Sequence, residues 1–237
     1  MLLVRATAVL ACLGLLSATS VSASEGAPPS ARCKAHRGER VVLRTVTGVV
    51  TDRYRTHPQP GLAEATHTDA YYGCLDRTGR RTFLGGVVES QNGGNGGRLD
   101  GFELSGPYVT FVYTFGSKYG TADTRVEQYD LRHGRRTFRT DYRDGSPEVQ
   151  RQNPFAQISP LNLATASNGY AAWVLTGCPI WCGFAVSLVV HDGEGTHMIA
   201  SYQLSTTESL VQVTDLQVTA QEVTWTHLGE RQSAPLR

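Results

Sequence analysis

The chain of 237 residues has 22 Lys and Arg against 21 Asp and Glu, which gives a formal net charge of +1. A chain this close to neutral has no excess charge to attract a nucleic-acid backbone, so we expect no nucleic-acid partner. The length and the 40% content of hydrophobic residues suit a single well-buried domain.

The amino terminus has the pattern of a secretory signal peptide. Arg5 precedes an apolar run over residues 6–16, and Val21-Ser22-Ala23 supplies the small residues that signal peptidase needs. The run is about half of the roughly 20 residues that a membrane-spanning helix requires. We therefore expect residues 1–23 to be cleaved, and residues 24–237 to be a secreted or extracytoplasmic domain without a transmembrane segment. A lipobox-like pattern ending at Cys12 leaves lipoprotein anchoring as an alternative.

Four cysteines follow the expected signal: Cys33, Cys74, Cys178 and Cys182. An even number in an exported chain indicates two disulfides. The sequence Cys-Pro-Ile-Trp-Cys makes closure between Cys178 and Cys182 easy, which leaves Cys33 to pair with Cys74. In the chain-entropy treatment, the long loop contributes about 4 kcal/mol and the short one about 2 kcal/mol. No second ligand pair accompanies Cys178 and Cys182, so we expect no metal site, and no cofactor motif is found.

Short runs with period-2 alternation predict an all-β chain, and no segment predicts a helix. In the clearest run, Val109, Phe111 and Tyr113 alternate with smaller residues, which indicates a strand with one bulky face and one slimmer face. We expect about four antiparallel units of four strands, the last one strand short. The units cover about 33–85 (strands 41–45, 48–54, 71–76, 81–84), 99–142 (third and fourth strands 124–131, 136–141), 158–203 (hairpin 189–199) and 209–237.

A repeated heptapeptide marks the same place in two units. Residues 77–83 read RTGRRTF and residues 132–138 read RHGRRTF. A polar tetrad with Gly at its third place, followed by a strand-like segment, predicts a hairpin turn between the third and fourth strands. Asp76 and Asp130 stand just before these turns, where Asp typically accepts backbone N–H bonds.

Units of this length, with an aromatic residue late in the second strand and an Asp beside the turn after the third, resemble the blades of β-propellers in the broad TolB-like and WD-repeat classes. The resemblance implies a propeller-like array and carries no activity, because the Gly-His and Trp-Asp signatures of WD repeats are absent. A β-sandwich or an open array of sheets is the alternative fold. If a ring closes, residues 24–40 could supply the missing outer strand of the last unit.

The sequence contains no recognisable catalytic motif. Long connections follow strands two and four of each unit, at about 55–69, 87–98, 115–122, 142–157 and 177–183, and in an up-and-down unit they would emerge on one face. Trp181 inside its disulfide ring is a plausible anchor on that face. The face would carry Arg53, Arg55, His57, Tyr119, Arg143, Asp144, Arg151, Phe155 and Trp181.

We therefore expect a secreted, non-catalytic binding protein whose partner is an unknown protein, peptide or glycan. The alternative is a secreted glycan-active hydrolase or lyase that uses a carboxylate and a His from different units, with Asp100, Glu103, His57 and Asp141 as candidates. A third possibility is self-association through the open edge of the last unit.

Overall fold

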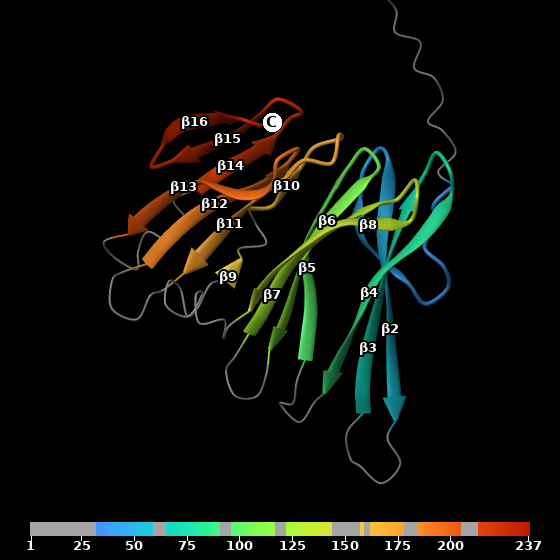
Figure 1. Ribbon diagram of the computed structural model, residues 1–237. Helices are drawn as coiled ribbons and strands as arrows, with labels where there is room; N and C mark the ends of the chain where they lie inside the picture. The colour runs from blue at the N-terminus through green and yellow to red at the C-terminus, as the bar shows by residue number, and fades with distance from the viewer. Residues whose placement is uncertain are drawn as a thin grey trace, which may run out of the picture. The chain divides into compact units, whose positions relative to one another are not determined.

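The computed structural model of the protein describes residues 32–58, 65–90, 96–116, 122–143, 157–158, 162–177, 184–204 and 213–237. These ranges contain no α-helix, and their strands form four antiparallel sheets (Figure 1). The predictions of an all-β chain and of antiparallel units are confirmed. Within the same ranges, no helix is long and apolar enough to cross a membrane.

Each sheet is built from strands that are consecutive in the chain. The first sheet contains β1 (Arg40–Arg44), β2 (Gly48–Pro58), β3 (Ala65–Leu75) and β4 (Arg80–Ser90). The second contains β5 (Gly96–Ser105), β6 (Tyr108–Gly116), β7 (Ala122–Asp130) and β8 (Arg135–Arg143). The third contains β9 (Gln157–Ile158), β10 (Ala164–Thr165), β11 (Ala171–Gly177), β12 (Phe184–Asp192) and β13 (Gly195–Leu204). The fourth contains β14 (Val213–Val218), β15 (Glu222–His227) and β16 (Glu230–Pro235).

The strand count agrees with the prediction in the first, second and fourth sheets. The fourth sheet has three strands in the order β14-β15-β16, as expected for an incomplete unit. The third sheet has five strands, because β11 pairs with the short β9 as well as with β10.

The first two sheets extend further than predicted. β2 continues to Pro58 and β3 begins at Ala65, directly opposite, so most of the expected loop at 55–69 is strand. β4 and β5 likewise occupy most of the expected loop at 87–98. These two loop predictions are wrong over the residues that form strands. The outer half of the β2–β3 hairpin is polar on both faces, which removes the alternation that marks a strand, although its Thr and Tyr residues favour extended backbone.

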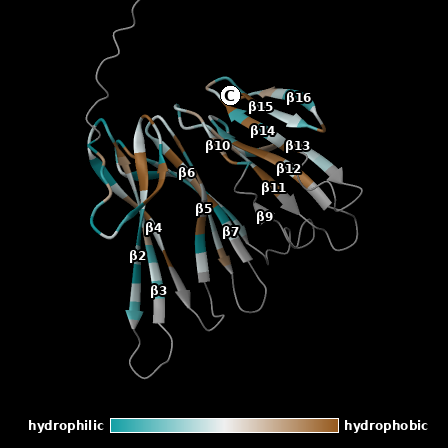
Figure 2. Cartoon of the chain, turned by 180° about the vertical axis from the view of Figure 1, so that it is seen from behind, coloured by the Kyte–Doolittle hydropathy of each residue, from teal (hydrophilic) through white to brown (hydrophobic). Residues whose placement is uncertain are grey.

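The core is a series of contacts between consecutive sheets. Val109 and Phe111 of β6 belong to the hydrophobic cluster shared with the first sheet, whereas Val112, on the opposite face, belongs to the cluster shared with the third. In β11, Trp173 packs with the second sheet and Val174 with the fourth. Burial of both faces makes the middle strands predominantly hydrophobic, and β6 and β12 are accordingly brown in Figure 2.

Two of these contacts between sheets also contain an indole hydrogen bond. Trp173 is fully buried, and its Nε1 donates to the hydroxyl of Tyr142 on β8 at 3.0 Å. Trp225 donates in the same way to Tyr202 on β13 at 2.9 Å. Burial raises the pKa of Tyr142, so this hydroxyl keeps its proton. The corresponding position on β6 is Phe111, which has no polar atom, and the contact between the first and second sheets is aromatic and aliphatic there.

The repeated heptapeptides form the predicted hairpin turns. Gly79 and Gly134 have φ of 66° and 65°, a left-handed conformation that glycine adopts without strain. Asp130 accepts the backbone N–H of Arg132 at 2.9 Å, as predicted. Burial alone would raise the pKa of Asp130, but hydrogen bonds from the side chains of Arg132 and His133 and from the Arg132 backbone lower it well below its ordinary value.

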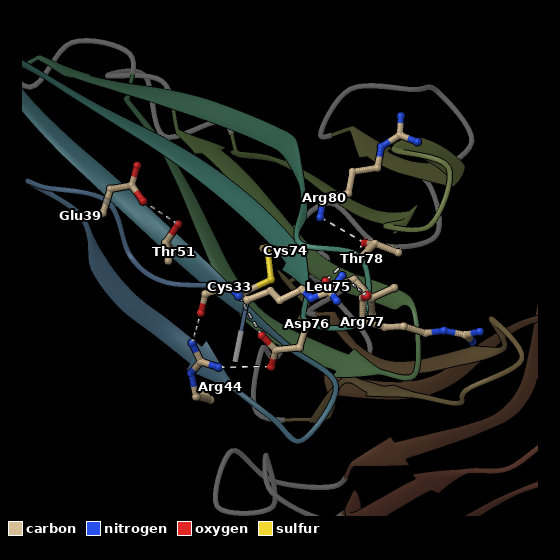
Figure 3. Close-up of a disulfide and its surroundings, with 11 residues drawn as sticks. Cys33, Glu39, Arg44, Thr51, Cys74, Leu75, Asp76, Arg77, Thr78 and Arg80 are labelled. Carbon is tan, nitrogen blue, oxygen red and sulfur yellow. Dashed lines mark hydrogen bonds and ion pairs between the residues drawn. A yellow bond between two sulfur atoms is a disulfide. The ribbon is translucent and has the colours of Figure 1, made fainter. Parts of the chain in front are cut away.

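The predicted disulfide between Cys33 and Cys74 is present, with the two Cα atoms 5.7 Å apart, and it ties the segment 32–39 to β3 (Figure 3). Asp76 accepts the backbone N–H of Cys33 at 3.1 Å, and Arg44 donates to the Cys33 carbonyl at 2.6 Å. The described part of 24–40 is thus held on the first sheet, which argues against its use as an outer strand of the last. A disulfide is typical of an oxidising compartment outside the cytosol. Cys178 and Cys182 lie outside the described residues.

Candidate functional site

A cleft with a cavity volume of about 610 Å³ lies where the first sheet meets the second. This volume is within the range of sites that enclose small molecules. β1, β2 and β3 provide one wall and β5 provides the other. The lining residues are Arg40, Val41, Val42, Leu43, Asp52, Asp69, Tyr71, Arg98, Leu99, Gly101 and Phe102.

The antiparallel register of β2 and β3 brings two carboxylates to this cleft. Asp52 is opposite Tyr71, and Asp69 is two residues before Tyr71, so both Asp side chains are on the same face of the sheet. Diagonal neighbours of this kind are typically about 7–8 Å apart. The pair is thus formed by residues that are distant in sequence but adjacent in the hairpin.

Asp52 is the most buried charged group of the cleft. Its side chain is fully buried, and its Oδ2 accepts a hydrogen bond at 2.5 Å from Nε of Arg40, whose side chain is 71% exposed. The hydrogen bond and the charge of Asp52, with a smaller contribution from the charge of Asp69, raise the pKa of Arg40. The second oxygen of Asp52, Oδ1, is buried and has no hydrogen-bond partner in the described parts of the chain.

The remaining lining combines a second guanidinium with apolar surface. Arg98 of β5 is exposed and lines the cleft opposite the two carboxylates. Tyr71 and Phe102 stack with ring centroids 5.3 Å apart, which joins the two walls. Val41 and Val42 are 49% and 41% exposed, although both are large aliphatic residues. The cleft therefore presents two acceptor groups, two donor groups and an apolar wall.

An exposed aromatic side chain continues the same face beyond the cleft. Tyr54 is directly opposite Asp69 in the β2–β3 register, so it is the next residue along the face that carries the two carboxylates. The ring of Tyr54 is 48% exposed and stacks on His67, with centroids 5.1 Å apart and planes 18° from parallel. A hydrogen bond between the Tyr54 hydroxyl and Nδ1 of His67 fixes this arrangement. We call Tyr54 and His67 the aromatic platform.

Those residues of the predicted binding face that the structure describes are not among the residues that line this cleft. Arg55 and His57 are strand residues of β2, and their position two and four places from Arg53 puts them on the face opposite Asp52 and Tyr54. There, Nε2 of His57 is 3.0 Å from the Thr68 hydroxyl. Of Arg143 only the backbone, at the end of β8, is described. The other members lie outside the described residues: Tyr119, Asp144, Arg151, Phe155 and Trp181.

The structure places the residues proposed for a catalytic site on three strands, with His57 on β2, Asp100 and Glu103 on β5, and Asp141 on β8. Asp141, on β8, is exposed and pairs with Arg139 at 2.6 Å. Glu103, on β5, has a raised pKa because it is partly desolvated, but it is not among the residues that line the cleft. The side chain of Asp100 lies outside the described part of the structure. Within the described ranges, no group of three or more His, Cys, Asp or Glu side chains is arranged to hold a metal ion.

The sequence analysis therefore missed the two carboxylates, Arg98 and the aromatic platform. One signal for them was present: Asp52 follows Val49-Val50-Thr51 within a strand, where a carboxylate must be buried or paired. The partners could not be found from this signal alone, since they depend on the hairpin register and on the packing of the second sheet. The chain matches no protein-family model and has no significant similarity to a protein of curated function.

Proposed function

We propose that the protein is a secreted, non-catalytic binding protein with a propeller-like array of sheets, and that its ligand occupies the cleft between the first and second sheets. The antiparallel sheets and their pairwise packing support the array, and the Cys33–Cys74 disulfide supports an extracytoplasmic location. In such folds, binding sites commonly form where rigid elements meet.

The observation that carries this proposal is the unsatisfied oxygen of Asp52 in the floor of the cleft. A buried acceptor without a donor costs about 1–3 kcal/mol, so proteins keep few of them without a reason. A ligand that donates a hydrogen bond to Oδ1 would recover this cost. The Arg40 side chain is mostly exposed, so it can adjust its position for a ligand while it stays paired with Asp52.

A second candidate, glycan hydrolysis, is favoured by the shared face of Asp52 and Asp69. Hydrolysis by a carboxylate pair needs the two groups about 5 to 10 Å apart and needs one of them to be protonated as a general acid. Asp52 accepts a hydrogen bond from Arg40 within an ion pair. A carboxylate held in this way is better suited to binding a ligand than to acting as the general acid of a hydrolase.

The test is a binding screen by isothermal titration calorimetry with the full-length secreted protein. The probes are neutral oligosaccharides, the acidic oligogalacturonides, basic chitosan oligosaccharides, and basic and acidic peptides. We expect one class to bind the native protein and to bind at least tenfold more weakly to Asp52→Asn and to Arg98→Gln. Glu230→Gln, on the exposed edge strand β16, is the matched control and should bind like the native protein.

The two candidates are separated by analysing the bound probe after prolonged incubation. A binding protein returns it intact, whereas a hydrolase returns shorter products whose formation requires Asp52 and Asp69. Absence of binding to every class, or equal binding by the native protein and both cleft variants, would show that the cleft is not the ligand site.

A further inference from the structure

We infer that the ligand is a neutral, hydroxyl-rich oligosaccharide, with one sugar unit in the cleft and the next unit on the aromatic platform. The inference rests on the proposed function, because it concerns the same cleft. It specifies the chemistry of the ligand and extends the site along β2 and β3 by the residues Tyr54 and His67.

The balance of charge in the cleft favours a neutral ligand. Asp52 and Asp69 supply two negative groups, and Arg40 and Arg98 supply two positive groups. A ligand with a net charge would meet a repelling like charge as often as an attracting opposite charge. The cleft therefore provides little electrostatic gain for such a ligand. A neutral ligand avoids this repulsion and still encounters strong donors and acceptors.

The hydrogen-bonding groups favour hydroxyls in particular. Carboxylates only accept hydrogen bonds, and guanidinium groups only donate them. A single hydroxyl does both, so adjacent hydroxyls on one sugar can donate to Oδ1 of Asp52 and accept from Arg98. The C–H faces of the same ring would pack on the apolar wall at Val41 and Val42, which are 49% and 41% exposed.

The aromatic platform fits the next unit of the chain. Tyr54 is exposed, is fixed by His67, and is opposite Asp69, so its ring adjoins the edge of the cleft. A rigid aromatic side chain provides contact area with little loss of entropy on binding. Its hydroxyl is already bonded to His67, so the free surface of the ring is what remains for a ligand.

The probes are neutral manno-, malto-, cello-, xylo- and N-acetylchito-oligosaccharides of one to four units, titrated into the native protein and its variants by calorimetry. We expect one series to bind, and affinity to rise from one unit to two or more. Asp52→Asn and Arg98→Gln should weaken every length by about tenfold or more. Tyr54→Ala should weaken the longer members by about fivefold and leave the single sugar unchanged.

Two controls separate stacking from general effects on the sheet. Tyr54→Phe keeps the ring and loses only the bond to His67, so it should retain affinity within about twofold of the native value. Phe83→Ala removes another aromatic side chain, 56% exposed, opposite Tyr72 on the other face of the sheet, and it should not alter binding. Circular dichroism of each variant should match that of the native protein.

The outcomes distinguish this inference from the proposed function. If a charged oligosaccharide or a peptide binds the native protein and this binding is lost in Asp52→Asn, the cleft is a ligand site but the inferred ligand class is wrong. If a neutral oligosaccharide binds with equal affinity to native protein and Tyr54→Ala at every length, the second subsite is wrong. If no probe binds in a manner dependent on Asp52 or Arg98, both the inference and the proposed function are wrong.

Discussion

Removal of the Cys33–Cys74 disulfide should cause a large loss of stability. The two cysteines are 41 residues apart in sequence, and the chain-entropy treatment assigns about 4 kcal/mol to a loop of that length. Cys33 is 1% exposed, so the double variant Cys33→Ala/Cys74→Ala also loses buried sulfur. The gain in entropy of the unfolded chain, once the crosslink is removed, nevertheless dominates this figure.

The assay is equilibrium unfolding in urea, followed by tryptophan fluorescence and by circular dichroism. With a slope of about 2 kcal/mol per M, the midpoint of the variant should fall by about 2 M. The comparison variant is Cys178→Ala/Cys182→Ala, because the disulfide proposed from the sequence for these two cysteines would close a small ring and contribute only about 2 kcal/mol.

The comparison between the two double variants is decisive. If Cys33→Ala/Cys74→Ala loses less stability than Cys178→Ala/Cys182→Ala, the long loop is not the main constraint and the entropic reasoning is refuted. Loss of signal from only part of the chain, seen as two separated transitions, would instead show that the first sheet unfolds independently of the others.

Three further predictions concern the fold. Tyr142→Phe leaves the indole N–H of the fully buried Trp173 without its acceptor and should lower the free energy of unfolding by about 1–3 kcal/mol, measured in urea; no change would mean that the indole finds another partner. Asp130 has a pKa in the folded state below its ordinary 3.8, so its stabilising contribution is present above about pH 4 and is lost as the pH falls toward the folded-state value. Asp130→Asn should therefore be less stable than the native protein at pH 6, with a difference that shrinks between pH 4 and pH 2; a pH-independent difference would contradict this. In Gly73→Ala the new Cβ would lie 2.7 Å from Cδ2 of the buried Leu131, and the overpacking should cost about 1–3 kcal/mol in thermal or urea unfolding; an unchanged midpoint would show that Leu131 moves aside freely.

Local features of the fold could be predicted from the sequence because they depend on near neighbours. The alternation at Val109 and Phe111 marks a strand whatever packs on it, and the slimmer face of that strand indeed meets the third sheet. The turn glycines and Asp130 act over four residues, so their roles also follow from local chemistry. The even cysteine count and the close spacing of Cys178 and Cys182 were together sufficient to predict the pair between Cys33 and Cys74.

The candidate site could not be predicted, since each of its elements depends on a relation between distant residues. Whether Asp52 or Arg53 faces the second sheet is set by alternation through the strand and by the hairpin register, and a shift of one residue would reverse the two faces. Arg98 reaches the cleft only because the second sheet packs on the first. The reasoning from loop lengths selected Arg55 and His57 as loop residues, whereas they belong to a strand whose polar composition concealed it.

The uneven distribution of indole hydrogen bonds has a consequence for how the chain can diversify. The second, third and fourth sheets are joined by directional bonds at Trp173 and Trp225 that tolerate little sliding. At the joint between the first two sheets, Phe111 is at the corresponding position and makes apolar contacts without a required direction, so a small displacement breaks no hydrogen bond at this position. The cleft lies at this joint. Substitutions that widen, narrow or reshape it can therefore be absorbed near Phe111 while the later sheets keep their alignment, so the shape of the cleft can change with little effect on the rest of the described fold.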